Sequence, residues 1–159
     1  MEVSPEEQKR YEELQVMALE FARRGQTEDL KAMLDVGMPA NLCDHKGNSL
    51  LMLASYNGNL GTTRMLIDLG AQVDKKNDRG QTPLAGVCFK GYLETKELVS
   101  AGANIYENNG MGTTPIMFAS MFGNYEIVKY LNSQNSSFKS KIYLTISKLF
   151  SLVKGLFKK

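Results

Sequence analysis

The chain has 159 residues, of which 43% are hydrophobic and 23% charged, a composition that predicts one folded domain and excludes a disordered or fibrous chain. Its net charge of +2 is unevenly distributed: residues 139–159 contain six lysines and no acidic residue, whereas the first 138 residues contain 13 basic and 17 acidic residues, a balance of −4. Only the C-terminal tail is basic, and it lacks a groove-reading motif, so we expect no nucleic-acid partner.

The first residues, MEVSPEEQKRYEEL, are acidic and lack the basic and apolar segments of a secretory signal. We therefore expect the chain to begin at Met1 and to be cytoplasmic. Cys43 and Cys88 fit no metal-binding spacing and are too few for a disulfide scaffold, which agrees with a reducing compartment. No apolar run reaches the length of a membrane-spanning helix.

The N-terminal segment predicts a long helix. Ser4, Pro5 and Glu7 form the pattern of a capping box, with proline at the first helical position. We expect this helix to extend to about Arg24 and to cap the N-terminal end of the fold. Apolar residues at helical spacing should point inward, namely Leu14, Met17, Ala18 and Phe21.

A short phrase then recurs with a period of 32 or 33 residues. Its copies are GNSLLMLASYNG, GQTPLAGVCFKG and GTTPIMFASMFG, which end at Gly58, Gly91 and Gly123, and Gly25 lies one period before the first. Each is followed by an amphipathic stretch. This periodicity predicts a repeat architecture in which each unit is a helix, a tight turn, a second helix and a protruding loop.

Capping residues mark the helix boundaries in the repeats. Thr82 and Thr114 each precede a proline, which is typical of a helix start, and Ser49 takes this position one repeat earlier. Glycines able to adopt a left-handed conformation end the first helices at Gly58, Gly91 and Gly123, and the second helices at Gly37, Gly70 and Gly102. Repeated apolar spacing predicts a core of Leu53, Leu66, Leu69, Leu84, Leu98, Ile116, Phe118, Ile127 and Leu131.

The segments DHKGNSLL, NDRGQTPL and NNGMGTTPI, with GAQVD and GANIY, resemble the ankyrin repeat over about residues 14–135. The resemblance implies an all-α ankyrin-repeat solenoid of about four helix-turn-helix repeats, with atypical capping helices at both ends. The expected repeats are residues 14–40, 44–74, 77–106 and 109–135, within a domain of residues 1–135.

Two features depart from the ankyrin pattern. The histidine usual after the TPL segment is replaced by Met52, Ala85 and Met117, so its network between repeats should be absent. Gly86 lies within a predicted helix, where glycine costs about 1 kcal/mol relative to alanine.

Residues 136–159 predict a basic amphipathic helix whose apolar side chains share one face while Lys148, Ser151, Lys154 and Lys158 lie opposite. In one interpretation the apolar face covers the open end of the last repeat, as terminal units of solenoids do. In the other it lies on a membrane surface, with the lysines attracted to anionic lipid. The face consists of Ile142, Ile146, Leu149, Phe150, Val153 and Phe157.

The repeat register places large side chains in a column. The two residues before each repeat glycine, and the loop tips, line the concave surface of an ankyrin stack, as the resemblance implies. Aromatic residues, arginine and methionine are enriched at protein interfaces, although single aromatics can equally be structural. The predicted protein-binding residues are Arg23, Tyr56, Asn57, Phe89, Lys90, Met121 and Phe122, with His45, Lys46, Asp78, Arg79 and Met111 at the loop tips.

Catalytic chemistry is not indicated. His45 is the only histidine, which excludes a two-histidine metal site within the chain, and no nucleophile with a base or phosphate-binding loop is evident. Cys43, Asp44 and His45 could contact a metal or haem, but the repeat explains this loop better. We therefore predict a protein that is not an enzyme and needs no cofactor.

Three functional hypotheses follow. The first is a monomeric adaptor that binds a protein partner of unknown identity. The second comes from the resemblance to small bacterial ankyrin proteins: an accessory factor for a peroxide-defence enzyme such as catalase, with haem delivery involving Cys43, His45, Tyr56 or methionines. The third is a scaffold held at the inner membrane surface by its C-terminal helix.

Overall fold

A computed structural model describes residues 4–92, 94–110, 112–134 and 139–156. These residues form nine helices and no strand beyond an isolated bridge between Cys43 and Ser49. Four helix pairs precede a single terminal helix: α1 (Pro5–Arg24) and α2 (Thr27–Asp35), α3 (Leu50–Tyr56) and α4 (Leu60–Asp68), α5 (Pro83–Lys90) and α6 (Glu94–Ser100), α7 (Pro115–Met121) and α8 (Tyr125–Gln134), then α9 (Lys139–Leu156). The predicted all-α repeat solenoid is confirmed.

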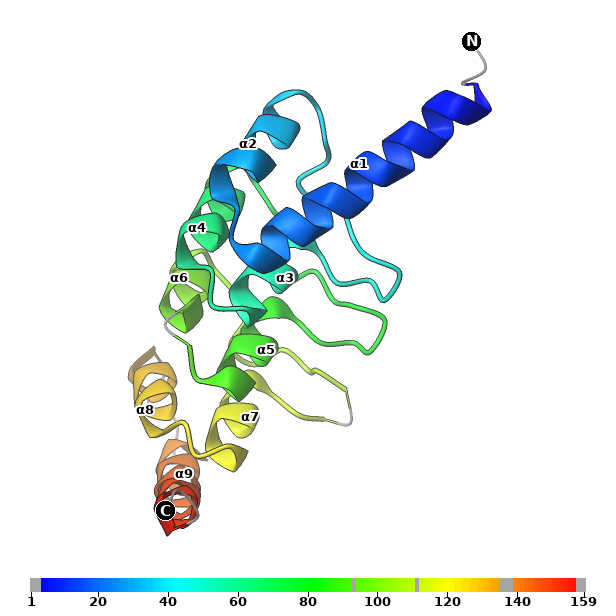
Figure 1. The fold of residues 1–159 in the computed structure, drawn as a ribbon. Helices are drawn as coiled ribbons and strands as arrows, with labels where there is room; N and C mark the ends of the chain where they lie inside the picture. Colours follow the sequence, from blue (N-terminus) through cyan, green and yellow to red (C-terminus); the bar gives the residue numbers. More distant parts are fainter. Residues whose placement is uncertain (1–3, 93, 111, 135–138, 157–159) are drawn as a thin grey trace.

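The helix pairs stack in chain order (Figure 1). The first helices form an inner column in which α1 contacts α3, α3 contacts α5 and α5 contacts α7, and the second helices form an outer column. Loops project from the inner column on the side away from the outer one, and α1 and α9 lie at opposite ends of the stack. Residues one period apart therefore become neighbours along the inner column.

The core follows the repeat. Leu66, Leu98 and Leu131 lie at the same position of successive outer helices and are at most 1% exposed. Burial of each such side chain stabilises the fold by about 1.5–3 kcal/mol. Leu69 was predicted to be buried, and this prediction is wrong: it follows the last turn of α4 and is 40% exposed.

The predicted capping pattern is confirmed at three helix starts. At α1, Ser4 Oγ accepts a hydrogen bond from the Glu7 N–H while Glu7 Oε2 accepts one from the Ser4 N–H. Ser49 caps α3 through the Met52 N–H, and Thr82 caps α5 through the Ala85 N–H. The glycines predicted to end the helices all have positive φ.

Thr114 does not cap α7, in contrast to the prediction. Its side chain accepts no hydrogen bond from the first turn of this helix, and its buried Oγ1 has no partner among the described residues. Thr82 differs because its hydroxyl also donates to Asn109 Oδ1 of the next loop, which holds it in place.

Helix α1 is longer than the surface it covers. Its C-terminal half packs on α3, with Ala18 and Ala22 fully buried, but its N-terminal half projects beyond the stack (Figure 1). Leu14 and Met17 are consequently 37% and 46% exposed. The prediction that they point inward is wrong, because the stack does not extend far enough along α1 to cover them.

Helix α9 packs on α7 and α8 and closes the C-terminal end of the stack. Its contact side contains Tyr143 and Leu144, half-buried against the core, and fully buried Ser147. Gly123 permits this contact: a Cβ there would lie 2.9 Å from the Ser151 nitrogen. Most of the face predicted from the sequence lies elsewhere on the helix: Ile142, Leu149, Phe150 and Val153 are at least 40% exposed, Ile146 is half-buried, and Phe157 lies outside the described residues.

Candidate protein-binding surface

The surface called here the inner-helix surface lies where the inner helices end. It consists of Arg23, Tyr56, Asn57, Phe89, Lys90, Met121 and Phe122. The repeat register brings four of its side chains into contact in two pairs. Phe89 and Phe122 meet edge to face, with ring centroids 4.3 Å apart, a geometry that aromatic quadrupoles favour. Lys90 Nζ lies 4.8 Å from the ring centroid of Tyr56, which is a cation–π distance.

These contacts leave much of the aromatic surface accessible to a partner. Tyr56 and Phe89 are each 38% exposed, and Met121 is 51% exposed. Gly86 lies against the Tyr56 ring. A side chain at this position would place its Cβ only 3.1 Å from Tyr56 Cδ2. The glycine that departs from helix propensity thus makes room for the ring.

Arg23, at the N-terminal end of the inner-helix surface, is held by two acidic residues. Its guanidinium lies 3.1 Å from Asp44 Oδ2 and 3.4 Å from Glu20 Oε2. Burial by itself would raise the pKa of Asp44, but hydrogen bonds from Asn48 and Lys46 and the charge of Arg23 outweigh it and hold this pKa below its ordinary value of 3.8. Arg23 therefore joins the first loop to α1 as well as lining the surface.

Asn57 has a structural bond of its own, since its side-chain amide donates to the Leu53 carbonyl at 2.7 Å. The predicted loop-tip residues His45, Lys46, Asp78 and Arg79 are all exposed. Met111 lies outside the described residues.

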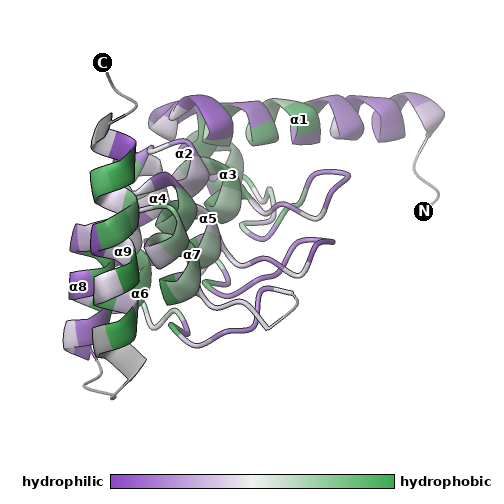
Figure 2. Cartoon of the chain, turned by 90° about the horizontal axis from the view of Figure 1, so that it is seen from below, coloured by the Kyte–Doolittle hydropathy of each residue, from purple (hydrophilic) through white to green (hydrophobic). Residues whose placement is uncertain are grey.

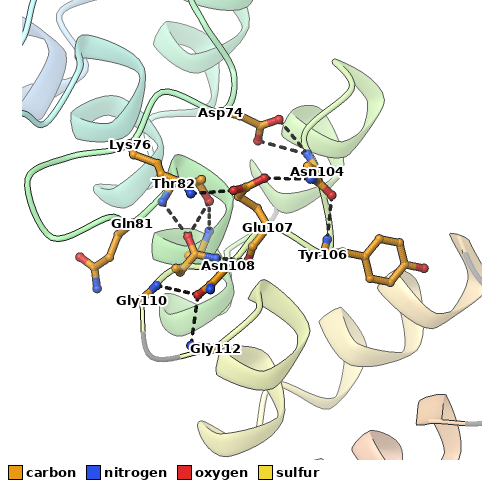
Figure 3. Close-up of polar contacts among 12 residues, drawn as sticks. Asp74, Lys76, Gln81, Thr82, Asn104, Tyr106, Glu107, Asn108, Gly110 and Gly112 are labelled. Carbon is orange, nitrogen blue, oxygen red and sulfur yellow. Dashed lines mark hydrogen bonds and ion pairs between the residues drawn. The ribbon is translucent and has the colours of Figure 1, made fainter.

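Adjacent loops are joined to one another. The Asp78 N–H donates to the Lys46 carbonyl, and the Asn77 side chain donates to Asn48 Oδ1. Further along the stack, Lys76 forms an ion pair with Glu107, and both oxygens of Asp74 accept from the Asn104 N–H (Figure 3). The loops consequently present their tips in a defined row.

The last loop has two neighbouring asparagines, Asn108 and Asn109, whose side chains make different hydrogen bonds. Asn108 Oδ1 accepts from the Gly110 and Gly112 N–H groups within the loop (Figure 3). Buried Asn109 instead reaches back, and its Oδ1 accepts from the Thr82 N–H and hydroxyl. In the preceding loop one residue, Asn77, holds the turn, because its Oδ1 accepts from the Arg79 and Gln81 N–H groups.

Sequence reasoning missed Tyr92. Asn59 and Asn124 each follow a repeat glycine, and their side-chain amides donate to carbonyls of the preceding inner helix. Tyr92 stands at the equivalent position, where it is 36% exposed and its ring would lie 3.5 Å from a Cβ at Gly58. The sequence did contain a signal for this residue, because Tyr92 occupies a repeat position where Asn59 and Asn124 stand in the neighbouring repeats.

Reactive groups are not gathered at this surface. Within the described ranges, no three His, Cys, Asp or Glu side chains are placed to hold a metal ion. Cys88 is a free thiol in the core, and burial raises its pKa well above the ordinary value. In the same part of the chain, no helix is both long and apolar enough to cross a membrane.

A stack of paired helices with an ordered row of loops and accessible aromatic residues defines a helical-repeat binding module. Comparison with known families specifies it: residues 70–142 match the family described as Ankyrin repeats (3 copies), and residues 46–78 match the family described as Ankyrin repeat. The chain belongs to the ankyrin repeat family. Ankyrin repeats generally mediate protein–protein interactions.

The chain spans less than a third of the length of each similar protein described here. An ankyrin repeat protein of Pseudomonas aeruginosa is 50% identical over 46 residues, which are 29% of this chain and 27% of that protein. A transient receptor potential cation channel subfamily A member 1 homolog of Caenorhabditis elegans is 38% identical over 107 residues, 67% of this chain and 9% of the channel. Protein fem-1 homolog A-like of Mus musculus is 32% identical over 60% of this chain and 15% of its own.

Proposed function

We propose that this chain is a non-enzymatic adaptor that binds a partner protein through the inner-helix surface. The observation that carries the proposal is the ordering of exposed aromatic side chains by neighbours in the next repeat, Tyr56 by Lys90 and Phe89 by Phe122. Side chains that are already held in place lose little conformational entropy on binding. Aromatic residues are also the commonest source of binding free energy at interfaces.

The charges beside the aromatic residues indicate the chemistry of the partner. Lys46 and Arg79 at the loop tips and Lys90 beside Tyr56 are exposed, and within the described residues none of the three forms an ion pair. A partner segment with an apolar side chain next to acidic residues would complement both features. The row of linked loops supports the same proposal, because it presents these cations in a defined order.

The test compares the wild type with the double variant Tyr56→Ala/Phe89→Ala. Partners captured from the native cell would be identified by mass spectrometry, purified and titrated against both proteins. We expect the double variant to lose about 1–2 kcal/mol or more of binding free energy, with its thermal unfolding unchanged.

Val36→Ala is the matched control, since Val36 is 88% exposed at the end of α2 in the outer column. It should bind as the wild type does. Equal affinity of the wild type and the double variant for the captured partner would remove the inner-helix surface from the proposal. Affinity that does not fall with added salt would contradict an acidic partner segment.

Haem delivery to a peroxide-defence enzyme lacks comparable support. The Cys43 thiol donates a hydrogen bond to the Asn41 carbonyl, and burial raises its pKa, which disfavours the thiolate that binds iron. We therefore do not retain haem delivery, and we propose that the adaptor acts as a monomer in the cytoplasm.

A further inference from the structure

The side of helix α9 that covers the end of the stack includes small and polar groups. Ser147 is fully buried, and its Oγ has no hydrogen-bond partner among the described residues. The backbone at Phe150 and Ser151 sits directly on Gly123, and Lys154 Nζ donates to the Phe122 carbonyl. Small and polar groups thus share the contact with Tyr143 and Leu144.

The apolar side chains of α9 lie on the opposite side. Leu149 and Leu152 are 62% and 63% exposed, Ile142 is 53% exposed and Val153 is 40% exposed. At 100° per residue these four side chains occupy one continuous sector of the helix, called here the outward strip. Figure 2 shows hydrophobic residues along most of the length of α9.

A cap alone does not require this outward strip. A helix selected only to close the stack would not leave Leu149 and Leu152 in water while it buries Ser147, because each exposed leucine forgoes its burial free energy. A continuous apolar strip on a surface marks a binding site for another apolar phase. The outward strip therefore has a separate occupant.

The charge of the segment identifies that occupant. Residues 139–159 contain six lysines and no acidic residue, while the rest of the chain is net negative. Lys148 is exposed, one residue from Leu149. An apolar strip on a helix without acidic residues complements an anionic lipid surface, where acyl chains receive the strip and headgroups attract the lysines.

We propose that the outward strip of α9 docks in the plane of an anionic membrane surface while the other side of the helix stays packed on α7 and α8. Because α9 and α1 lie at opposite ends of the stack (Figure 1), docking places α1 farthest from the bilayer. The inner-helix surface then remains open to a protein partner.

The first experiment measures binding of the full chain to sedimenting vesicles. One set contains phosphatidylcholine alone, and the other contains phosphatidylcholine mixed with phosphatidylglycerol. We expect binding to the anionic vesicles to be about tenfold stronger or more, and to weaken as salt is added. Equal binding to both sets, or none to either, would overturn the proposal.

Variants then separate the strip from the charge. Leu149→Gln/Leu152→Gln should bind anionic vesicles about tenfold more weakly or worse, and Lys148→Gln about fivefold more weakly. Both leucines are more than 60% exposed, so circular dichroism and thermal unfolding should match the wild type. Vesicle binding that is unaffected by the double substitution would contradict the proposal.

Two further controls exclude other readings. Val36→Gln, on an even more exposed apolar residue away from α9, should bind vesicles as the wild type does. Tyr56→Ala/Phe89→Ala should do so too, which separates this inference from the adaptor function. Self-association in sedimentation velocity that the double leucine variant abolishes, without vesicle binding, would assign the strip to a second copy and overturn the proposal.

Discussion

At the scale of single residues, Gly86 and Tyr56 form a matched pair across two repeats. Alanine in place of Gly86 would favour helix α5 by about 1 kcal/mol. Its Cβ would approach Tyr56 Cδ2 at 3.1 Å, so the ring must move by a few tenths of an ångström. The exposed tyrosine has room to move, but its position beside Lys90 would change.

We therefore predict that Gly86→Ala raises the free energy of unfolding by up to about 1 kcal/mol and weakens partner binding. Urea denaturation and titration with the identified partner measure the two effects separately. A loss of stability would show that the Tyr56 ring cannot yield, and unchanged affinity would show that its position does not matter for binding.

Asp44 provides a pH-dependent contribution to stability. Its pKa is lowered in the folded protein, so the contribution is complete well above the ordinary value of 3.8 and is lost as the pH falls through that value toward the folded pKa. Asp44→Asn keeps the turn, because Asn77 accepts the same two N–H hydrogen bonds in the next loop. It removes the charge that faces Arg23, together with the Oδ2 acceptor of the hydrogen bonds from Arg23 and the Asn48 side chain.

The expected loss for Asp44→Asn is about 1 kcal/mol at neutral pH, and the difference from the wild type should shrink below pH 4. Denaturation curves at pH 7 and pH 3 test both statements. A difference of the same size at both values would contradict the assignment to the ionised carboxylate.

At the scale of the helices, the two threonine–proline starts have different energetics. The Thr82 hydroxyl accepts from the Ala85 N–H and donates to buried Asn109, whereas the Thr114 hydroxyl is buried without a partner among the described residues. We predict that Thr82→Val costs about 1–3 kcal/mol and that Thr114→Val is neutral or stabilising. Thermal unfolding of the two isosteric variants provides the comparison, and equal losses would contradict it.

At the scale of the whole molecule, α9 is a structural part of the stack as well as a candidate docking surface. A chain ending at Gln134 would expose Gly123 and the faces of α7 and α8 that Tyr143 and Leu144 cover. We predict a loss of about 2 kcal/mol or more of the free energy of unfolding.

Urea denaturation of the truncated chain tests this contribution, with full-length Leu149→Gln/Leu152→Gln as the control that leaves the contact side intact. Unchanged stability after truncation would show that α9 does not serve as a cap.

The features that could be read from the sequence are local or periodic. Thr82 and the glycine at each helix end act within a few residues, and the 33-residue period alone makes Tyr56 and Phe89 equivalent positions. The fold and the column of candidate binding residues follow from these features. Periodicity cannot reveal how the rings pair with Lys90 and Phe122, because side-chain directions depend on packing.

The direction in which a helix faces was decided by tertiary contacts. The spacing of apolar residues in α9 is the same whether they point to the stack or to solvent. In the structure α9 packs closely on Gly123, with Ser147 inward and Leu149 outward. Leu14 and Met17 are exposed for a related reason, since α1 extends past its neighbour. Sequence patterns show that a helix has an apolar face, but only the shape of the surface it meets determines which side is buried.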